Sequence, residues 1–163
     1  MQEEKSCCFF GTDDFRNVKQ VKEKIQEAIE ILVNEVKITS FYFVGGDKFN
    51  RLCKELVQTI NSPKISCFAY QRRGRYLLKK EIGSSRPPEK ILLSEEKGDF
   101  VLFRDRWLLE RCNAVLFYEQ GEFLPLEKNK KRIVQLALSY AYQLKGKGKN
   151  LRIFRIPTEN KRT

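Results

Sequence analysis

Two short apolar runs, each ending in glycine and each followed by a helix-forming segment, constrain the fold most strongly. Residues 6–10 lead into Gly11-Thr12, and residues 40–44 lead into Gly45-Gly46-Asp47. A strand that ends in glycine and passes into a helix commonly borders a phosphate ligand in α/β sheets. Glycine lets the backbone approach the ligand, and the N–H groups at the helix start face its negative charge. The pattern therefore predicts an α/β sheet with a ligand-binding edge.

Apolar periodicity extends this pattern along the chain. Stripes with spacings of three and four predict helices over residues 18–36, 49–60, 103–111 and 128–144. Short β-branched and aromatic runs predict one strand that ends near residue 10 and further strands over residues 40–44, 65–70, 113–118 and 151–156, with a short strand at 90–93. Residues 72–75 and 83–88 have the composition of loops.

Because helices connect most of these strands, the sheet should be mostly parallel with right-handed crossovers. The predicted fold class is α/β: a single-domain, Rossmann-like, three-layer fold over residues 1–157, followed by a frayed basic tail at residues 158–163. A chain of 163 residues, 41% of them hydrophobic, fits one domain with a sizeable core.

The residue composition excludes several kinds of chemistry. Histidine is absent, which removes the commonest general base and every Ser-His or Cys-His nucleophile. The five cysteines contain no Cys-x-x-Cys pair, so we expect no metal site, and we expect no cofactor. Unpaired thiols, a polar N-terminus and the lack of a long apolar run predict a cytoplasmic protein without a membrane segment.

The positive charge is concentrated near the C-terminus. Residues 128–163 carry eleven basic side chains and one acidic one, and so account for +10 of the net charge of +11. Such clusters attract polyanions without sequence preference. One interpretation is therefore a nucleic-acid-binding module, and the alternative, which is slightly favoured, is a solvated basic face. The residues that would bind nucleic acid are Lys128, Lys130, Lys131, Arg132, Lys145, Lys147 and Lys149.

Two arginines near the start of the helix predicted at 103–111 are candidate ligand-binding residues. Arg104 and Arg106 would oppose the positive end of the helix dipole, which invites a functional reason such as a fork of donors for phosphate. Alternatively, either arginine pairs with Asp105 or Glu110 at the surface. Both interpretations stay open.

The turns allow plainer interpretations as well. Gly11-Thr12 is favoured as a simple turn that needs a positive φ, whereas Gly45-Gly46-Asp47 is a stronger candidate because a convincing strand precedes it and a convincing helix follows it. Neither turn has the dinucleotide fingerprint or the P-loop pattern. After the strand at 113–118, Glu119 and Gly121 lie at the same sheet edge. Only the carboxylates of Glu119, Glu122 and Glu127 are placed there to act as a base. The favoured interpretation of all three is that they are solvated side chains of a loop.

Taken in order, residues 8–11, 41–52 and 104–116 resemble the SLOG superfamily, and most closely its YpsA-like branch. The superfamily also contains the "lonely guy" phosphohydrolases and the DprA-type single-strand DNA binders. The resemblance covers about residues 6–156 and is weak over 71–99. It implies a Rossmann-like sheet whose nucleotide or nucleotide-derived ligand is held by Gly11 and Thr12, by the Gly45-Gly46-Asp47 turn, and by Arg104. Arg104 lies nine residues before Asn113, where the family has an arginine nine residues before an aspartate.

This chain departs from the family pattern at two places. The glycine-rich turn and catalytic glutamate that phosphohydrolases carry after the matching strand are replaced by residues 119–128, which keep one glycine. The family's small residue after Gly46 is replaced by Asp47-Lys48. The first hypothesis is a non-catalytic protein that binds or senses a nucleotide. The alternatives are a nucleoside-monophosphate phosphoribohydrolase, the nucleic-acid-binding module, and a scaffold for a protein partner. Homo-oligomers are common in the family.

Overall fold

The computed structural model describes residues 4–12, 17–44, 47–60, 62–93, 100–118 and 128–156, apart from the side chains at 100, 102 and 128–132. In chain order the elements are β1 (Ser6–Gly11), α1 (Val18–Asn34), β2 (Ser40–Val44), α2 (Lys48–Gln58), β3 (Ser66–Arg73), β4 (Tyr76–Glu81), β5 (Glu89–Leu92), α3 (Phe100–Arg111), β6 (Ala114–Tyr118), α4 (Lys128–Gly146) and β7 (Arg152–Ile156).

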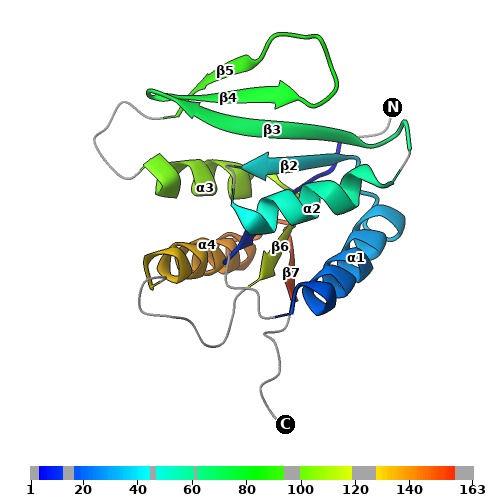
Figure 1. The fold of residues 1–163 in the computed structure, drawn as a ribbon. Coiled ribbons are helices and arrows are strands. Elements are labelled where there is room, and N and C mark those ends of the chain that lie inside the picture. The colour runs from blue at the N-terminus through cyan, green and yellow to red at the C-terminus, as the bar shows by residue number, and fades with distance from the viewer. Residues whose placement is uncertain are drawn as a thin grey trace.

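The strands form one mostly parallel sheet (Figure 1), in the order β5-β4-β3-β2-β1-β6-β7. The pairs β1–β2, β2–β3, β1–β6 and β6–β7 are parallel, whereas β3–β4 and β4–β5 are antiparallel. The predicted α/β class and mostly parallel sheet are confirmed, and the arrangement is compatible with a Rossmann-like fold. No helix within the described ranges is long and apolar enough to cross a membrane.

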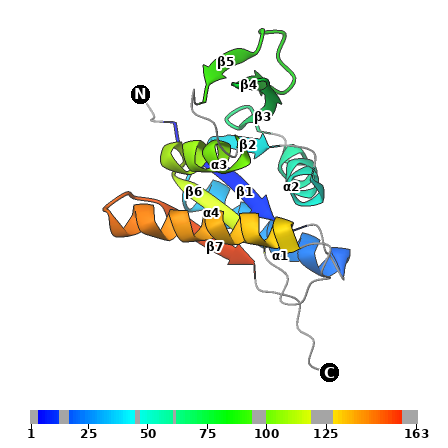
Figure 2. The same ribbon diagram turned by 90° about the vertical axis from the view of Figure 1, so that its left-hand side faces the viewer.

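Alternating strand residues supply two apolar cores, one on each face of the sheet. Phe9 and Phe41 join buried side chains of α1 and α2 in the first core. Phe10 and Tyr42, the next residues along β1 and β2, join buried side chains of α3 and α4 in the second core. The two views agree that α1 and α2 lie on one side of the sheet and that α3 and α4 lie on the other (Figures 1 and 2). Successive side chains of a strand point to opposite faces, and both faces are covered, so the central strands β1, β2 and β6 are mostly apolar.

The structure differs from the sequence prediction most in the segment between α2 and α3. β3 runs three residues beyond the predicted strand, to Arg73, and turns through Gly74 into β4, which the sequence did not reveal. Gly74 has a φ of 64°, the left-handed conformation that a tight turn requires. Together with β5, close to the predicted short strand at 90–93, this hairpin adds an antiparallel extension to the parallel sheet.

The helices also differ in detail from their predicted bounds and faces. α1 is capped by Asn17, whose side chain accepts a hydrogen bond from the Gln20 backbone N–H at 3.1 Å. Val18, at the head of its predicted buried stripe, is 51% exposed. In α4, Leu136 is also exposed, and the buried residues are Val134, Ala137 and Ala141.

All five cysteines are free, as expected, and four of them are fully buried. Burial raises the pKa of the thiols of Cys7, Cys8 and Cys53 well above 9.0, because the thiolate would lose its hydration. Cys67 is only half-buried, and desolvation raises its pKa as well. These side chains therefore act as small apolar groups of the core.

Candidate functional site

A cavity of about 390 Å³ opens at the carboxyl edge of β1 and β2. The chain reverses its direction of travel across the sheet beside β1, because β2 lies on one side of β1 and β6 on the other. Ligands of open α/β sheets bind at such a point. Three of the predicted ligand-binding residues, Gly11, Asp47 and Arg104, line the cavity. The other described lining residues are Phe10, Val44, Asn50, Val101, Asp105, Ile133 and Val134.

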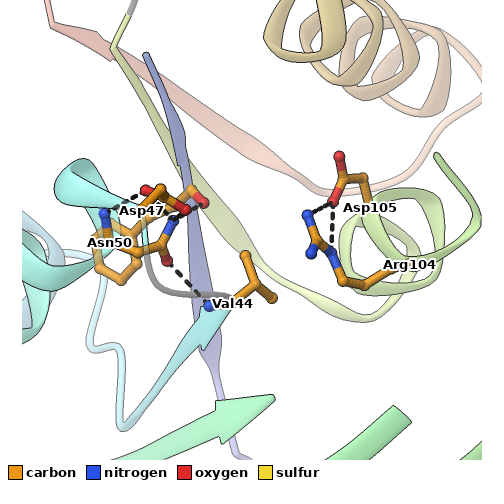
Figure 3. Close-up of polar contacts among 6 residues, drawn as sticks. Val44, Asp47, Asn50, Arg104 and Asp105 are labelled. Carbon is orange, nitrogen blue, oxygen red and sulfur yellow. Dashed lines mark hydrogen bonds and ion pairs between the residues drawn. The ribbon is translucent and has the colours of Figure 1, made fainter. Parts of the chain in front are cut away.

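Asp47 and Asn50 organise the wall of the cavity at the start of α2 (Figure 3). Asp47 is the N-cap of α2, and its Oδ1 accepts a hydrogen bond from the Asn50 backbone N–H at 2.8 Å. The Asn50 side-chain amide donates to both carboxylate oxygens of Asp47, at 3.2 and 3.1 Å. Asp47 therefore acts as a capping residue, which sequence analysis had not separated from a ligand contact.

Asn50 also ties together the ends of two strands. Its Oδ1 accepts from the Val44 backbone N–H at 3.1 Å, and its Nδ2 donates to the Phe9 carbonyl at 3.3 Å. The side chain is 3% exposed, so both strand groups would be buried without partners if the amide were removed. Sequence analysis had not singled out Asn50 as a site residue. A signal was present, because an asparagine three residues after a capping aspartate is a polar residue on an otherwise apolar helix face.

Arg104 and Asp105 form the facing wall, on α3. The Nε and Nη2 groups of Arg104 donate to Oδ1 of Asp105 at 3.0 and 2.9 Å. The aspartate side chain is 2% exposed and the arginine 20%, so the pair is largely removed from water. Arg104 therefore pairs with Asp105, as one of the two open interpretations had it, but the pair is largely buried and not at the surface. Figure 3 shows the guanidinium extending from α3 toward Val44, and within the described residues its Nη1 has no hydrogen-bond partner.

The dipole argument for these arginines fails in part, because α3 begins at Phe100 and Arg104 is its fifth residue. The helix dipole acts mainly within the first turn. Arg106 points elsewhere: it is exposed, and its guanidinium lies 5.1 Å from the ring centroid of Tyr140, on α4. Arg106 does not line the cavity.

Gly11 and Thr12 are held by the sheet and by α2. Gly11 lacks the positive φ that the plain-turn interpretation required. A Cβ built at Gly11 would lie 2.4 Å from Cγ of Phe49, so glycine is needed there because α2 packs directly on the end of β1. Thr12 is 2% exposed, and its backbone N–H donates to the Tyr118 carbonyl at 3.2 Å. It is outside the described lining of the cavity.

The chemistry of the cavity combines apolar walls with a few charged groups. Phe10, Val44 and Val134 supply apolar surface, while the charged groups of the described lining are one guanidinium and two carboxylates. A small number of oriented polar groups in an apolar cleft is typical of small-molecule sites. In the described ranges, no three side chains of the cysteine, aspartate and glutamate types come together as metal ligands do.

Other predicted site residues fall outside the described ranges or away from this cavity. Gly45, Gly46, Glu119 and Gly121 lie outside the described residues, as do the side chains of Lys128, Lys130, Lys131 and Arg132. Lys145 and Lys147 are exposed near the end of α4. Lys149 is half-buried, and its Nζ donates to the Glu110 carbonyl at 2.7 Å. Lys149, one of the residues predicted to bind nucleic acid, therefore links the segment after α4 to α3.

A comparison with models of known protein families found no match, and a comparison with curated proteins found none either.

Proposed function

We propose that this chain is a nucleotide-binding or nucleotide-sensing protein of the SLOG type, related to its YpsA-like branch, with a single three-layer domain and no catalytic activity. The observation that carries the proposal is the cavity that brings Gly11, Asp47 and Arg104 to one edge of the parallel sheet. These three residues come from separate segments, and all three were named from the strand-glycine-helix pattern or from the resemblance.

In this proposal, Arg104 would contact the phosphate of the ligand. Its Nη1 provides a donor in addition to the two groups that bind Asp105. Asp105 would keep the guanidinium in place, because a fixed donor loses less entropy when it binds. The apolar surface of Phe10, Val44 and Val134 would contact the base or ribose.

The proposal that the protein is non-catalytic is supported by the hydrogen bonds that the two carboxylates of the cavity already make. Asp47 caps α2, and Asp105 binds Arg104. A general base must reach the proton that it removes, and these two carboxylates already have structural partners. A nucleoside-monophosphate phosphoribohydrolase would instead need Glu119, Glu122 or Glu127, and release of free base from nucleoside monophosphates would support that alternative.

The test is native mass spectrometry of the freshly purified protein, followed by titration with nucleoside monophosphates. We expect an added mass that matches a nucleotide and a saturable affinity. Arg104→Lys keeps the charge but loses the fork of donors, and should weaken binding about ten- to hundredfold, since a hydrogen bond to a charged group contributes about 1.5–3 kcal/mol. Arg106→Lys is the matched control, because Arg106 lies outside the cavity. Equal losses in both variants, or no bound nucleotide at any concentration, would contradict the proposal.

The nucleic-acid-binding alternative is favoured by one observation, the exposure of Lys145 and Lys147. It predicts that affinity for single-stranded DNA or RNA falls steeply with salt concentration and falls further in the Lys145→Glu/Lys147→Glu variant. The native mass spectra also report whether the chain forms a homo-oligomer. The free thiols support a reducing, cytoplasmic setting in this proposal.

A further inference from the structure

A second cavity, of about 470 Å³, lies at the opposite edge of the sheet, where the parallel strands begin. Three short segments form most of it: Lys5 directly precedes β1, residues 37–39 precede β2, and residues 62–65 precede β3. Val33, on α1, completes the described lining. The described lining contains three lysines, Lys5, Lys37 and Lys64, and no carboxylate. The cavity is thus separate from the proposed nucleotide site. Its charged side chains are all positive, whereas those of the proposed nucleotide site are one arginine and two aspartates.

The cavity has an apolar floor beneath the lysines. Ile38 is 2% exposed and belongs to the first core, and Val33 and Ile65 pack against that core. The rim is fixed by Thr39, whose Oγ1 accepts from the Lys5 backbone N–H and donates to the Lys5 carbonyl, both at 3.3 Å. These hydrogen bonds fix part of the cavity's lining to the sheet. The volume of the cavity is in the range of small-molecule sites.

The three lysines are available to a ligand. Among the described residues, none of the three forms an ion pair within 4.0 Å. Lys37 is also the only described non-glycine residue with a positive φ, at 67°. Glycine or asparagine would adopt that conformation at lower cost, so the backbone at position 37 is locally strained.

We propose that this cavity binds an organic anion, that is, a small molecule that joins an apolar body to a negatively charged group. The apolar body would lie on Ile38, Val33 and Ile65, and the charged group would meet the lysine ammonium groups. The competing explanation is structural. α1 and α2 both end near this edge without a basic residue in their last turns, so the lysines would only offset the negative helix ends.

The experiment uses 8-anilinonaphthalene-1-sulfonate, a fluorescent anion with an apolar body, and the full chain. Fluorescence titration measures its affinity, and backbone amide NMR shifts of Ile38, Thr39 and Ile65 locate it. The test variant is Lys37→Gly/Lys64→Ala, in which glycine relieves the strain at position 37. The matched control is Lys19→Ala/Lys22→Ala, which removes two exposed lysines of α1. A thermal melt of each variant precedes the titration, because the probe also binds unfolded chains.

The proposal predicts saturable binding, shifts confined to the three amides, and an affinity that falls roughly fivefold for each lysine removed, which corresponds to about 1 kcal/mol for unit charges 4 Å apart in water. The control should bind as the parent does. Shifts at Gly11 or Arg104 in place of Ile38 would overturn the proposal, as would equal affinities of the test variant and the parent. A lower melting temperature with unchanged affinity would assign the lysines to the helix ends instead.

Discussion

The contact between Gly11 and Phe49 gives the sharpest prediction of stability. A Cβ at position 11 would lie 2.4, 2.5 and 2.9 Å from three ring carbons of Phe49, where ordinary contacts are 3.4–4 Å. The ring cannot swing aside easily, because Phe49 is fully buried and stacks on Tyr118 with centroids 5.7 Å apart. The Gly11→Ala variant must therefore move the ring, and α2 with it, by about 1 Å to restore an ordinary contact.

The free energy of unfolding should fall by about 2 kcal/mol in Gly11→Ala. Overpacking of a dense core costs about 1–3 kcal/mol, and the rigid partner favours the upper part of that range. A gain of about 0.5 kcal/mol offsets this cost, because alanine restricts the unfolded chain and the backbone at Gly11 needs no positive φ. For a chain of this size the melting temperature should fall by about 4–8 °C.

Urea denaturation followed by circular dichroism measures the effect, and a double-mutant cycle assigns it. Phe49→Ala removes the ring and should cost about 3–5 kcal/mol alone. Because the clash then has no partner, adding Gly11→Ala should cost nothing further, which gives a coupling energy of about 2 kcal/mol. Additive costs, or a Gly11→Ala variant as stable as the parent, would refute the packing argument. In the second case the glycine would be needed only for a ligand to approach.

Three further predictions concern buried polar groups and thiols. Asn50→Ala should lower the free energy of unfolding by about 3 kcal/mol in urea titrations, because a strand N–H and a strand carbonyl lose their buried partner; a loss below about 1 kcal/mol would contradict this. Stability should be constant from pH 7 to about pH 8 and fall at higher pH, because burial raises the pKa of Cys8 above 9.0 and that of Tyr42 above 10.0, so the unfolded chain ionises first. Urea titrations from pH 7 to 11 measure the slope, and a flat profile would be inconsistent with it. In native protein, Cys67 should react first with a disulfide reagent, because the other thiols are fully buried; Cys67→Ser should abolish this fast phase, and a fast phase that persisted would mean that another thiol is accessible.

Most of the parallel sheet could be predicted from the sequence, because its signals are local. Residues 40–44 form a strand with the predicted bounds, and β6 begins one residue later than predicted, since short β-branched and aromatic runs between turn residues specify buried strands. The hairpin of β3 and β4 was missed for a related reason. β3 ends in the polar residues Gln71 to Arg73, and β4 is partly exposed and ends in two lysines and a glutamate. Neither strand therefore has a clear alternation of period two.

The candidate site could be predicted only in part. Gly11, Asp47 and Arg104 line one cavity. Gly11 and Asp47 meet there because parallel strands end at one edge of the sheet, whereas Arg104 comes from α3. Their individual roles were not predictable. Arg106 has the same residue type as Arg104 and lies two positions away, yet it faces Tyr140, since residues two apart on a helix point in different directions.

The sequence by itself determined the α/β class and most of the parallel sheet, because hydrophobic periodicity and glycine turns are set by residues close together in the chain. Only the tertiary structure decided why Gly11 must be glycine, which arginine faces the cavity, and that Asn50 joins two strands. The second cavity also appears only in the folded chain, where residues from before three different strands meet. Each of these features depends on the position at which α2, α3 or a strand end packs, and that position is fixed by contacts between residues far apart in the sequence.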